Sequence, residues 1–157
     1  MQGGQVVNRM RSSYTSGAAP ELRRVPGTRP RVVYCVVSHA NPPQILRLVR
    51  TIRASSPESF ILVHHDYNNA YLDPRDAQTA GASHVMGSRT RLEWGRFNQQ
   101  LPVYRALKWL QENHDYDWFV LISGQDYPIQ PLAKVEAFLG ASPYDGFVES
   151  RSIVQAN

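Results

Sequence analysis

Polar side chains that could bind a ligand follow two apolar stretches of the sequence. Trp118 to Ile122 is an unbroken apolar run, and the polar residues Ser123 to Asp126 (S-G-Q-D) come directly after it. Phe60 to His65 is a second such run, and Asp66 follows it. Ligands of open α/β sheets bind outside the carboxyl ends of the strands, so both polar stretches are candidate binding loops. A carboxylate at the position of Asp66 is well placed to accept hydrogen bonds from the sugar or base of a nucleotide.

Both stretches also have a purely structural interpretation. Ser123 to Asp126, followed by Pro128, is typical of a polar turn before a helix, which the pattern predicts from about Leu132 to Leu139. An Asp that starts a loop, as Asp66 does, often only caps that loop. The residue types alone leave the two interpretations open.

Two further stretches have the composition of metal sites, but their positions argue against metal binding. Asp115 and Asp117 precede the strand predicted at Trp118 to Ile122, so they lie at its amino end, away from the ligand edge. His64 and His65 are neighbours in a strand and face opposite sides of the sheet. The loop after residue 122 offers a single carboxylate, which alone holds a divalent cation poorly. We therefore predict no metal site and interpret Asp115 and Asp117 as turn formers.

Other nucleophile and phosphate-binding motifs are absent from the sequence. It contains no G-x-S-x-G, no G-x-x-x-x-G-K-[ST] and no G-x-G-x-x-G. These absences disfavour an α/β-hydrolase, a P-loop enzyme and an ordinary dinucleotide dehydrogenase. Trp94-Gly95, just before a helix predicted at about Asn98 to Glu112, is the remaining candidate. It is either simple packing with a glycine turn or a flat apolar wall beside a ligand.

Length and composition indicate one globular domain. The 157 residues are 42% hydrophobic and 19% charged, and the single cysteine excludes an internal disulfide framework. Cys35 lies in an apolar run and is best interpreted as a small buried side chain. The sequence has no apolar run of the about 20 residues that span a bilayer and no secretory signal, so we expect a cytoplasmic protein without a membrane span.

The positive charge is concentrated near the amino terminus. Six arginines and one glutamate give residues 1–31 a net charge of +5, which leaves −1 for the rest of the chain, whose total is +4. The globular part thus lacks the basic patch that a nucleic-acid partner requires. Residues 1–29 mix Gly, Ser, Pro and Arg without periodicity, and we predict a disordered basic tail there.

Alternating strands and helices must position the candidate residues. Besides the two runs above, Arg31 to Val37 predicts a first strand, and the spacing of apolar residues from Ile45 to Ile52 predicts a helix capped by Asn41. Weaker patterns predict a short strand at Ser83 to Met86 and another at Tyr144 to Glu149. A strand, helix and strand in this order favour a right-handed parallel crossover. We expect the Trp118 to Ile122 strand to be buried on both faces of a largely parallel sheet.

Four ordered motifs resemble the Branch family of glycosyltransferases, which includes peptide O-xylosyltransferases and core-2 β-1,6-N-acetylglucosaminyltransferases. Val36 to His39 resembles the family's V-V-x-H, Ile61 to Asp66 its I-H-V-D, and Trp94-Gly95 its W-G. Leu121 to Ile129 (L-I-S-G-Q-D-Y-P-I) resembles L-S-x-x-D-[YF]-P-[IL], which is the most specific of the four. The resemblance extends over residues 31–149. It implies a GT-A fold, similar to a Rossmann fold, with a largely parallel sheet flanked by helices.

The resemblance also implies roles for individual residues. Val37, His39 and Asp66 would contact the uridine of a UDP-sugar, and Trp94-Gly95 would lie beside that donor. The reaction would be an inverting transfer without a metal or other cofactor, to a sugar or peptide hydroxyl. Asn68 stands where the family often has Lys or Arg, which leaves one nucleotide contact unfilled.

A second set of residues would shape the floor of the site or bind the acceptor. In this set are Ser123, Gly124 and Asp126, together with Glu149, which resembles an acceptor-binding residue of the core-2 branch. In the family, the catalytic base and the basic residues for the diphosphate come after the counterpart of Glu149. We therefore expect residues 30–157 to be the donor-binding part of an incomplete domain, inactive alone, with the catalytic residue unassigned. The alternative is a noncatalytic Rossmann-like nucleotide-binding module or a decayed enzyme fragment.

Overall fold

A computed structural model of the chain describes residues 29–89 and 95–147. The predicted tail, apart from Arg29, lies outside the described residues, as do Trp94 and Glu149. None of the helices in these two ranges is both long and apolar enough to cross a membrane.

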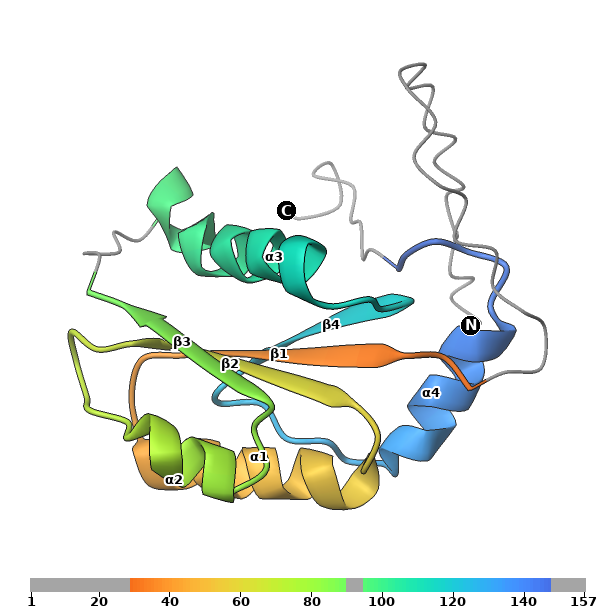
Figure 1. The fold of residues 1–157 in the computed structure, drawn as a ribbon, viewed down its shortest axis with the longest axis horizontal. Helices are drawn as coiled ribbons and strands as arrows, with labels where there is room; N and C mark the ends of the chain where they lie inside the picture. Colours follow the sequence, from red (N-terminus) through yellow and green to blue (C-terminus); the bar gives the residue numbers. More distant parts are fainter. Residues whose placement is uncertain (1–28, 90–94, 148–157) are drawn as a thin grey trace, which may run out of the picture.

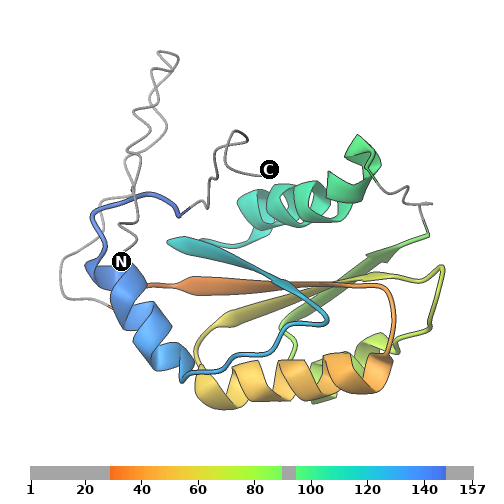
Figure 2. The same ribbon diagram turned by 180° about the vertical axis from the view of Figure 1, so that it is seen from behind.

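Four parallel strands form a sheet between two layers of helices (Figures 1 and 2). The strands are β1 (Val32–Ser38), β2 (Phe60–Asp66), β3 (His84–Ser88) and β4 (Trp118–Ser123), in the order β3-β2-β1-β4. The helices α1 (Pro42–Ser55), α2 (Pro74–Thr79) and α4 (Leu132–Ala141) pack on one face, and α3 (Leu101–Asn113) packs on the other. The predicted α/β architecture is confirmed.

The two central strands carry the core because they are apolar on both faces. On one face, Tyr34 and Val36 of β1 pack with Ile61 and Val63 of β2 against α1. On the other face, residues of the same strands pack against Ala106 and Leu110 of α3. β-Branched side chains suit such doubly covered strands. The buried face of α1 follows from the predicted helical spacing: Ile45, Leu48, Val49 and Ile52 are all fully buried.

The expectation that the Trp118 to Ile122 run is buried on both faces is wrong. Within the described residues β4 is an edge strand, paired only with β1. Helix α3 contacts β1, β2 and β3. As a result Leu121, on the α3 side of β4, is 51% exposed. An apolar run predicts burial on both faces only if covering elements are present on both.

The order of the strands creates a reversal point in the sheet. From β1 the chain moves outward through β2 to β3, and then crosses back to place β4 on the other side of β1. The loops after β1 and β4 are therefore neighbours at the carboxyl edge, and both lead to the helix layer of α1 and α4. In open α/β sheets a crevice forms outside the carboxyl ends of the strands at such a point.

Two predicted boundaries differ from the structure. The helix predicted from Asn98 begins as a 3-10 turn, η1 (Phe97–Gln100), and becomes α-helical at Leu101, with Pro102 in its first turn, where a missing N–H is tolerated. The described part of the predicted last strand, residues 144–147, pairs with no strand. Instead the ring of Phe147 stacks on Trp118, with 5.8 Å between ring centroids, so side-chain packing takes the place of strand pairing there.

Candidate ligand site at the carboxyl edge of the sheet

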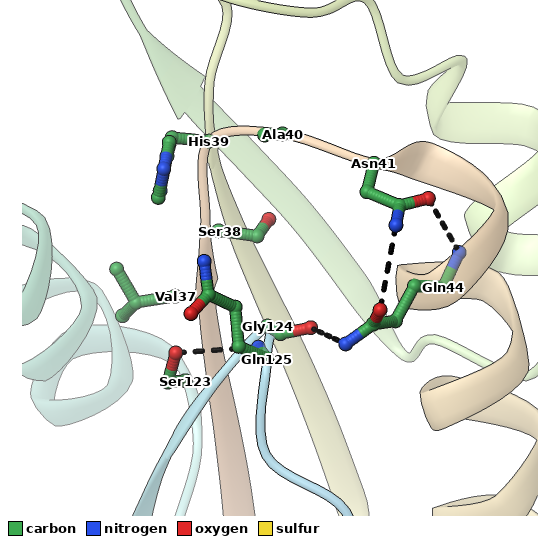
Figure 3. A pocket seen from close by; sticks show the side chains of 9 residues that line it. All are labelled: Val37, Ser38, His39, Ala40, Asn41, Gln44, Ser123, Gly124 and Gln125. Carbon is green, nitrogen blue, oxygen red and sulfur yellow. Dashed lines mark hydrogen bonds between the residues drawn. The ribbon is translucent and has the colours of Figure 1, made fainter.

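A pocket of about 310 Å³ lies between the loops that follow β1 and β4 and the start of α1 (Figure 3). The end of β4 and the loop after it contribute three consecutive residues, and the others belong to β1, its loop and the first turn of α1. The lining residues are Val37, Ser38, His39, Ala40, Asn41, Gln44, Ser123, Gly124 and Gln125. None of them has a carboxylate, ammonium or guanidinium group, and His39 is the one residue among them with a titratable side chain. The polar groups that line the pocket are thus mainly neutral.

Gly124 brings the β1 and β4 loops into direct contact. Its N–H donates to the carbonyl oxygen of Val37 at 2.8 Å, continuing the β1–β4 ladder by one residue. A Cβ atom at this position would lie 2.8 Å from Cβ of Ser38, closer than real Cβ contacts occur. Because the glycine is buried against the chain of β1, no larger side chain fits without separating the loops.

Asn41 and Gln44 connect α1 to the β4 loop by side-chain hydrogen bonds. The Asn41 amide nitrogen donates to Oε1 of Gln44 at 3.4 Å, and the Gln44 amide nitrogen donates to the Gly124 carbonyl at 3.2 Å (Figure 3). Asn41 has a left-handed backbone, with φ 53° and ψ 64°, which Asn tolerates better than most residues. The left-handed turn swings the chain from the end of β1 into α1, and the two amides then fix the width of the pocket.

The amino terminus of α1 has no backbone donor left for an anion. Pro42 and Pro43 lack N–H groups, and the N–H groups of Gln44 and Ile45 both donate to the carbonyl oxygen of Asn41. Phosphate sites at helix amino termini depend on free N–H groups that point at the ligand. Neutralisation of a diphosphate in this pocket would therefore need charged groups from another part of the protein.

Ser38 and His65 pair across β1 and β2 below the pocket. The distance from Ser38 Oγ to His65 Nδ1 is 2.9 Å, and the distance from His65 Nε2 to the carbonyl oxygen of Ala70 is also 2.9 Å. Both side chains are buried, and Tyr67 packs edge-on against the imidazole with 4.9 Å between ring centroids. The histidine therefore joins the end of β1 to the loop after β2.

The structure brings together four of the predicted site residues, Val37, His39, Ser123 and Gly124, which all line the pocket. Asp66 is outside the lining: it is 5% exposed, and its Oδ1 accepts from the backbone N–H and the side-chain amide of Asn68. The other members of the predicted set also lie apart from the pocket or outside the described residues.

Asp126 and Gly95 have local structural roles in the structure. Asp126 accepts a hydrogen bond from the Ser123 N–H at 2.8 Å and donates its own N–H to the Ser123 carbonyl, so it closes the turn after β4. Gly95 has a φ of 75°, which favours glycine, and its N–H donates to the side chain of Gln99 before α3. Neither residue lines the pocket.

Asp115 and Asp117 lie at the amino end of β4, as predicted, and Asp117 binds Arg31. Its carboxylate accepts from the Arg31 backbone N–H at 2.7 Å and from the guanidinium at 3.1 Å, while Asp115 lies 3.9 Å from the same guanidinium. Among residues 29–89 and 95–147, no group of three His, Cys, Asp or Glu side chains could hold a metal ion.

His64 differs from His65 in having no hydrogen-bond partner for either ring nitrogen among the described residues. It faces α3 and is fully buried. Burial lowers the pKa of His64, and the nearby positive charge of Arg105 lowers it further. The neutral ring therefore acts as a packing group, and the opposite orientation of His64 and His65 agrees with the alternation predicted from the sequence.

Four lining residues were missed by the sequence reasoning: Ser38, Ala40, Asn41 and Gln44, whereas Gln125 belongs to the candidate loop Ser123 to Asp126. A signal existed for two of them. Asn41 and Gln44 have the spacing of a capping box, in which the residue three after the cap reaches back towards it. The closeness of Ser38 to the β4 loop depends on pairing between distant strands, which no local pattern reveals.

Comparison with known protein families matches residues 32–155 to Branch, described as Core-2/I-Branching enzyme. The chain belongs to the Branch family. This is a glycosyltransferase family, and membership suggests nucleotide-sugar donors and carbohydrate acceptors as partners of the chain. The match includes β1 to α4, and with them every element that lines the pocket in this Branch protein. No curated protein matches the sequence.

Proposed function

We propose that this pocket holds the nucleotide of a UDP-sugar donor in an inverting, metal-independent glycosyl transfer. The observation that carries the proposal is the position of the pocket. It lies between the loops of β1 and β4, where the strand order reverses at the carboxyl edge of the sheet. Nucleotides bind at this point in open α/β folds. Membership of a glycosyltransferase family makes a sugar nucleotide the natural ligand class.

The proposal assigns binding, rather than the chemical step, to the described residues. Inverting transfer needs a carboxylate to take the proton of the acceptor and positive charge to stabilise the departing diphosphate. The pocket lining contains neither group, and the donors of the α1 amino terminus are already used. We therefore propose that the base and the diphosphate-neutralising charges come from outside this lining. The lining residues then supply the donor-binding part of the site.

Calorimetry with UDP tests the binding. We expect weak binding that is the same in EDTA and in added manganese, because the recognising groups are neutral side chains and backbone. A strict requirement for manganese would contradict metal independence, and no binding in any condition would contradict the donor site.

The role of Asp66 needs a separate variant and a matched control. If its carboxylate contacts the nucleotide, Asp66→Ala should weaken UDP binding by about 1.5 to 3 kcal/mol, the usual contribution of a hydrogen bond to a charged group. Asp115→Ala removes a carboxylate that is 87% exposed at the opposite end of the sheet and should leave the affinity unchanged. An unchanged affinity in Asp66→Ala as well would restrict Asp66 to its hydrogen bonds with Asn68.

A noncatalytic binding module is the second candidate, and the absence of a carboxylate from the pocket lining favours it. The two candidates differ in turnover once the rest of a transferase site is supplied. We expect no UDP release from UDP-sugars and saccharide or peptide acceptors with the 157-residue chain alone. Robust release would place a catalytic base within the chain and would exclude the noncatalytic module.

A further inference from the structure

The hydroxyl of Ser38 has a direction that the hydrogen bonds of His65 determine. A carbonyl oxygen can only accept, so the 2.9 Å contact between His65 Nε2 and the Ala70 oxygen requires a hydrogen on Nε2. The neutral imidazole carries one hydrogen, which leaves Nδ1 as an acceptor. The Ser38 hydroxyl, 2.9 Å away, must then donate to Nδ1. Its oxygen retains only lone pairs for any other partner.

Ser38 is also one of the residues that line the pocket. The close approach of Gly124 holds the side chain of Ser38 at the contact between the β1 and β4 loops. Ser38 is 4% exposed and His65 is fully buried, so water does not compete freely for the pair. A ligand that fills the pocket reaches an acceptor whose direction is already fixed.

We propose that Ser38 is a specificity-determining residue, which accepts an N–H or O–H hydrogen of the ligand, and that His65 is the positioning residue that makes it an acceptor. The inference rests on the proposed function, in which the ligand is the nucleotide of a donor. Ligands that present a donor at this point are favoured. Those that present a carbonyl or an unprotonated ring nitrogen meet the lone pairs of Ser38 and are disfavoured.

Ser38 and His65 are also the residue types of a nucleophile and its general base, but the loop after β4 does not support acyl transfer. Acyl transfer needs free N–H donors for the developing oxyanion. The Gly124 N–H donates to Val37, the Gln125 N–H to Ser123 Oγ at 3.2 Å, and the Asp126 N–H to the Ser123 carbonyl. All three amides of the turn are thus already used, which favours recognition over hydrolysis.

Nitrogen NMR of the folded chain tests the direction of the hydroxyl without any ligand. We expect the Nδ1 of His65 to give the signal of an unprotonated nitrogen and Nε2 that of a protonated one at neutral pH. A protonated Nδ1 would make Ser38 a free donor and would overturn the inference. This measurement is independent of the proposed function, because it needs no binding.

Calorimetry with UDP tests the consequence for the ligand. Ser38→Ala should weaken UDP binding about two- to tenfold, the range of one neutral hydrogen bond. Ser142→Ala is the matched control, since it removes a hydroxyl outside the pocket that accepts from a backbone N–H, that of Tyr144, and should leave the affinity unchanged. Equal affinity in Ser38→Ala and wild type would overturn the role of Ser38 and leave the proposed function standing.

A double-mutant cycle separates positioning from general stability. His65→Val keeps a strand-favouring side chain but frees the hydroxyl, and we expect about a twofold loss of UDP affinity. In the Ser38→Ala background the same change should have no effect, because His65 acts only through Ser38. An equal loss in both backgrounds would overturn the positioning role. If the wild type binds no UDP, both the proposed function and the ligand half of the inference fall, whereas the nitrogen signals still decide the direction of the hydroxyl.

Discussion

At the amino end of the sheet ion pairs join distant segments of the chain, whereas at the carboxyl end the loops around the pocket are joined by neutral groups. Glu136 of α4 is 2% exposed and accepts from Arg29 at 2.6 Å, from the Tyr34 hydroxyl at 3.2 Å and from the Ser56 hydroxyl. Burial, followed by the negative charge of Glu136, raises the pKa of Tyr34 well above its ordinary value, so its hydroxyl remains a donor. Beside this network, Arg31 pairs with Asp117.

At the carboxyl end, amides, hydroxyls and an imidazole join the loops around the pocket. Gln44 bonds Gly124, and Ser38 bonds His65, with no ion pair among these groups. A buried carboxylate fixes its partners strongly and becomes costly if one of them is lost. Hydrogen bonds between neutral groups are weaker, but these groups retain lone pairs and hydrogens that can form hydrogen bonds with a ligand. The difference agrees with our proposal that the carboxyl end binds the ligand, while the ion pairs of the amino end contribute to stability.

Glu136→Ala should have the largest effect on stability. It leaves the buried hydroxyls of Tyr34 and Ser56 without their acceptor, and we expect a loss of about 3 kcal/mol in the free energy of unfolding by urea. Glu136→Gln keeps an acceptor and should cost clearly less. Neither change should alter UDP affinity in the folded protein by more than about twofold, since the two ends are separate. A loss of UDP binding in folded Glu136→Gln would contradict the division between the ends.

Among the substitutions at the carboxyl end, Gly124→Ala should reduce UDP affinity most. The added methyl group meets Ser38 at 2.8 Å, so the β1 and β4 loops must separate. We expect UDP affinity to fall tenfold or more and stability to fall by about 1 to 3 kcal/mol, as for other overpacked sites. Gly146→Ala is the control, because a Cβ there meets no atom within 4 Å. Similar affinities for the two variants in calorimetry would show that the loop contact does not shape the site.

His64 differs from the hydrogen-bonded groups around the pocket, because its buried ring has no hydrogen bond to the described residues. Its pKa is lower in the folded state than in the unfolded chain, so below about pH 6.5 the unfolded state binds the proton more readily. This histidine therefore costs stability as the pH falls, by up to about 1.4 kcal/mol per pH unit. In urea unfolding at pH 7 and pH 5, His64→Leu should lose less stability than wild type. An identical loss would contradict this role of His64.

Gln44→Ala should have the smallest effect. It removes one neutral hydrogen bond to Gly124 at the rim of the pocket, so UDP affinity should fall only two- to threefold in calorimetry. Gln44→Glu sharpens the test, because it keeps the acceptor for Asn41 but turns an oxygen towards the Gly124 carbonyl. We expect it to bind UDP more weakly than Gln44→Ala. The reverse order would mean that the amide bridge is irrelevant to the site.

Most of the fold could be predicted because its signals are local. The β-branched run of β1, the apolar spacing of α1 and the cap at Asn41 each identified an element to within one or two residues. The two-sided burial of β4 could not be predicted, because it depends on which helices cover which strand. The apolar sequence of Trp118 to Ile122 is the same whether or not a helix lies over Leu121.

The sequence predicted which residues lie at the carboxyl edge of the sheet, but not the contacts between them. Gly124 was expected at the carboxyl edge because it closely follows an apolar run, and Val37 was indicated as a site residue by the resemblance to the Branch family. That Gly124 must be a glycine follows from the backbone of β1, which approaches it only through strand pairing. The pairing of His65 with Ser38 has the same origin, since the two residues are opposite each other in the β1–β2 register. Such contacts join residues far apart in the sequence, where pattern and propensity carry no information.

The central position of β1 also has a consequence for the order of folding. Val33 pairs with Phe60, which follows soon in the chain, whereas Val32 pairs with Trp118 much later. Closing the longer loop, between β1 and β4, costs more entropy, so the β1–β2 unit is expected to form first. One edge of β1 stays unpaired until β4 adds to it. The pocket exists only after that second pairing. A nucleotide bound at the proposed site would therefore stabilise the finished sheet and not the early unit.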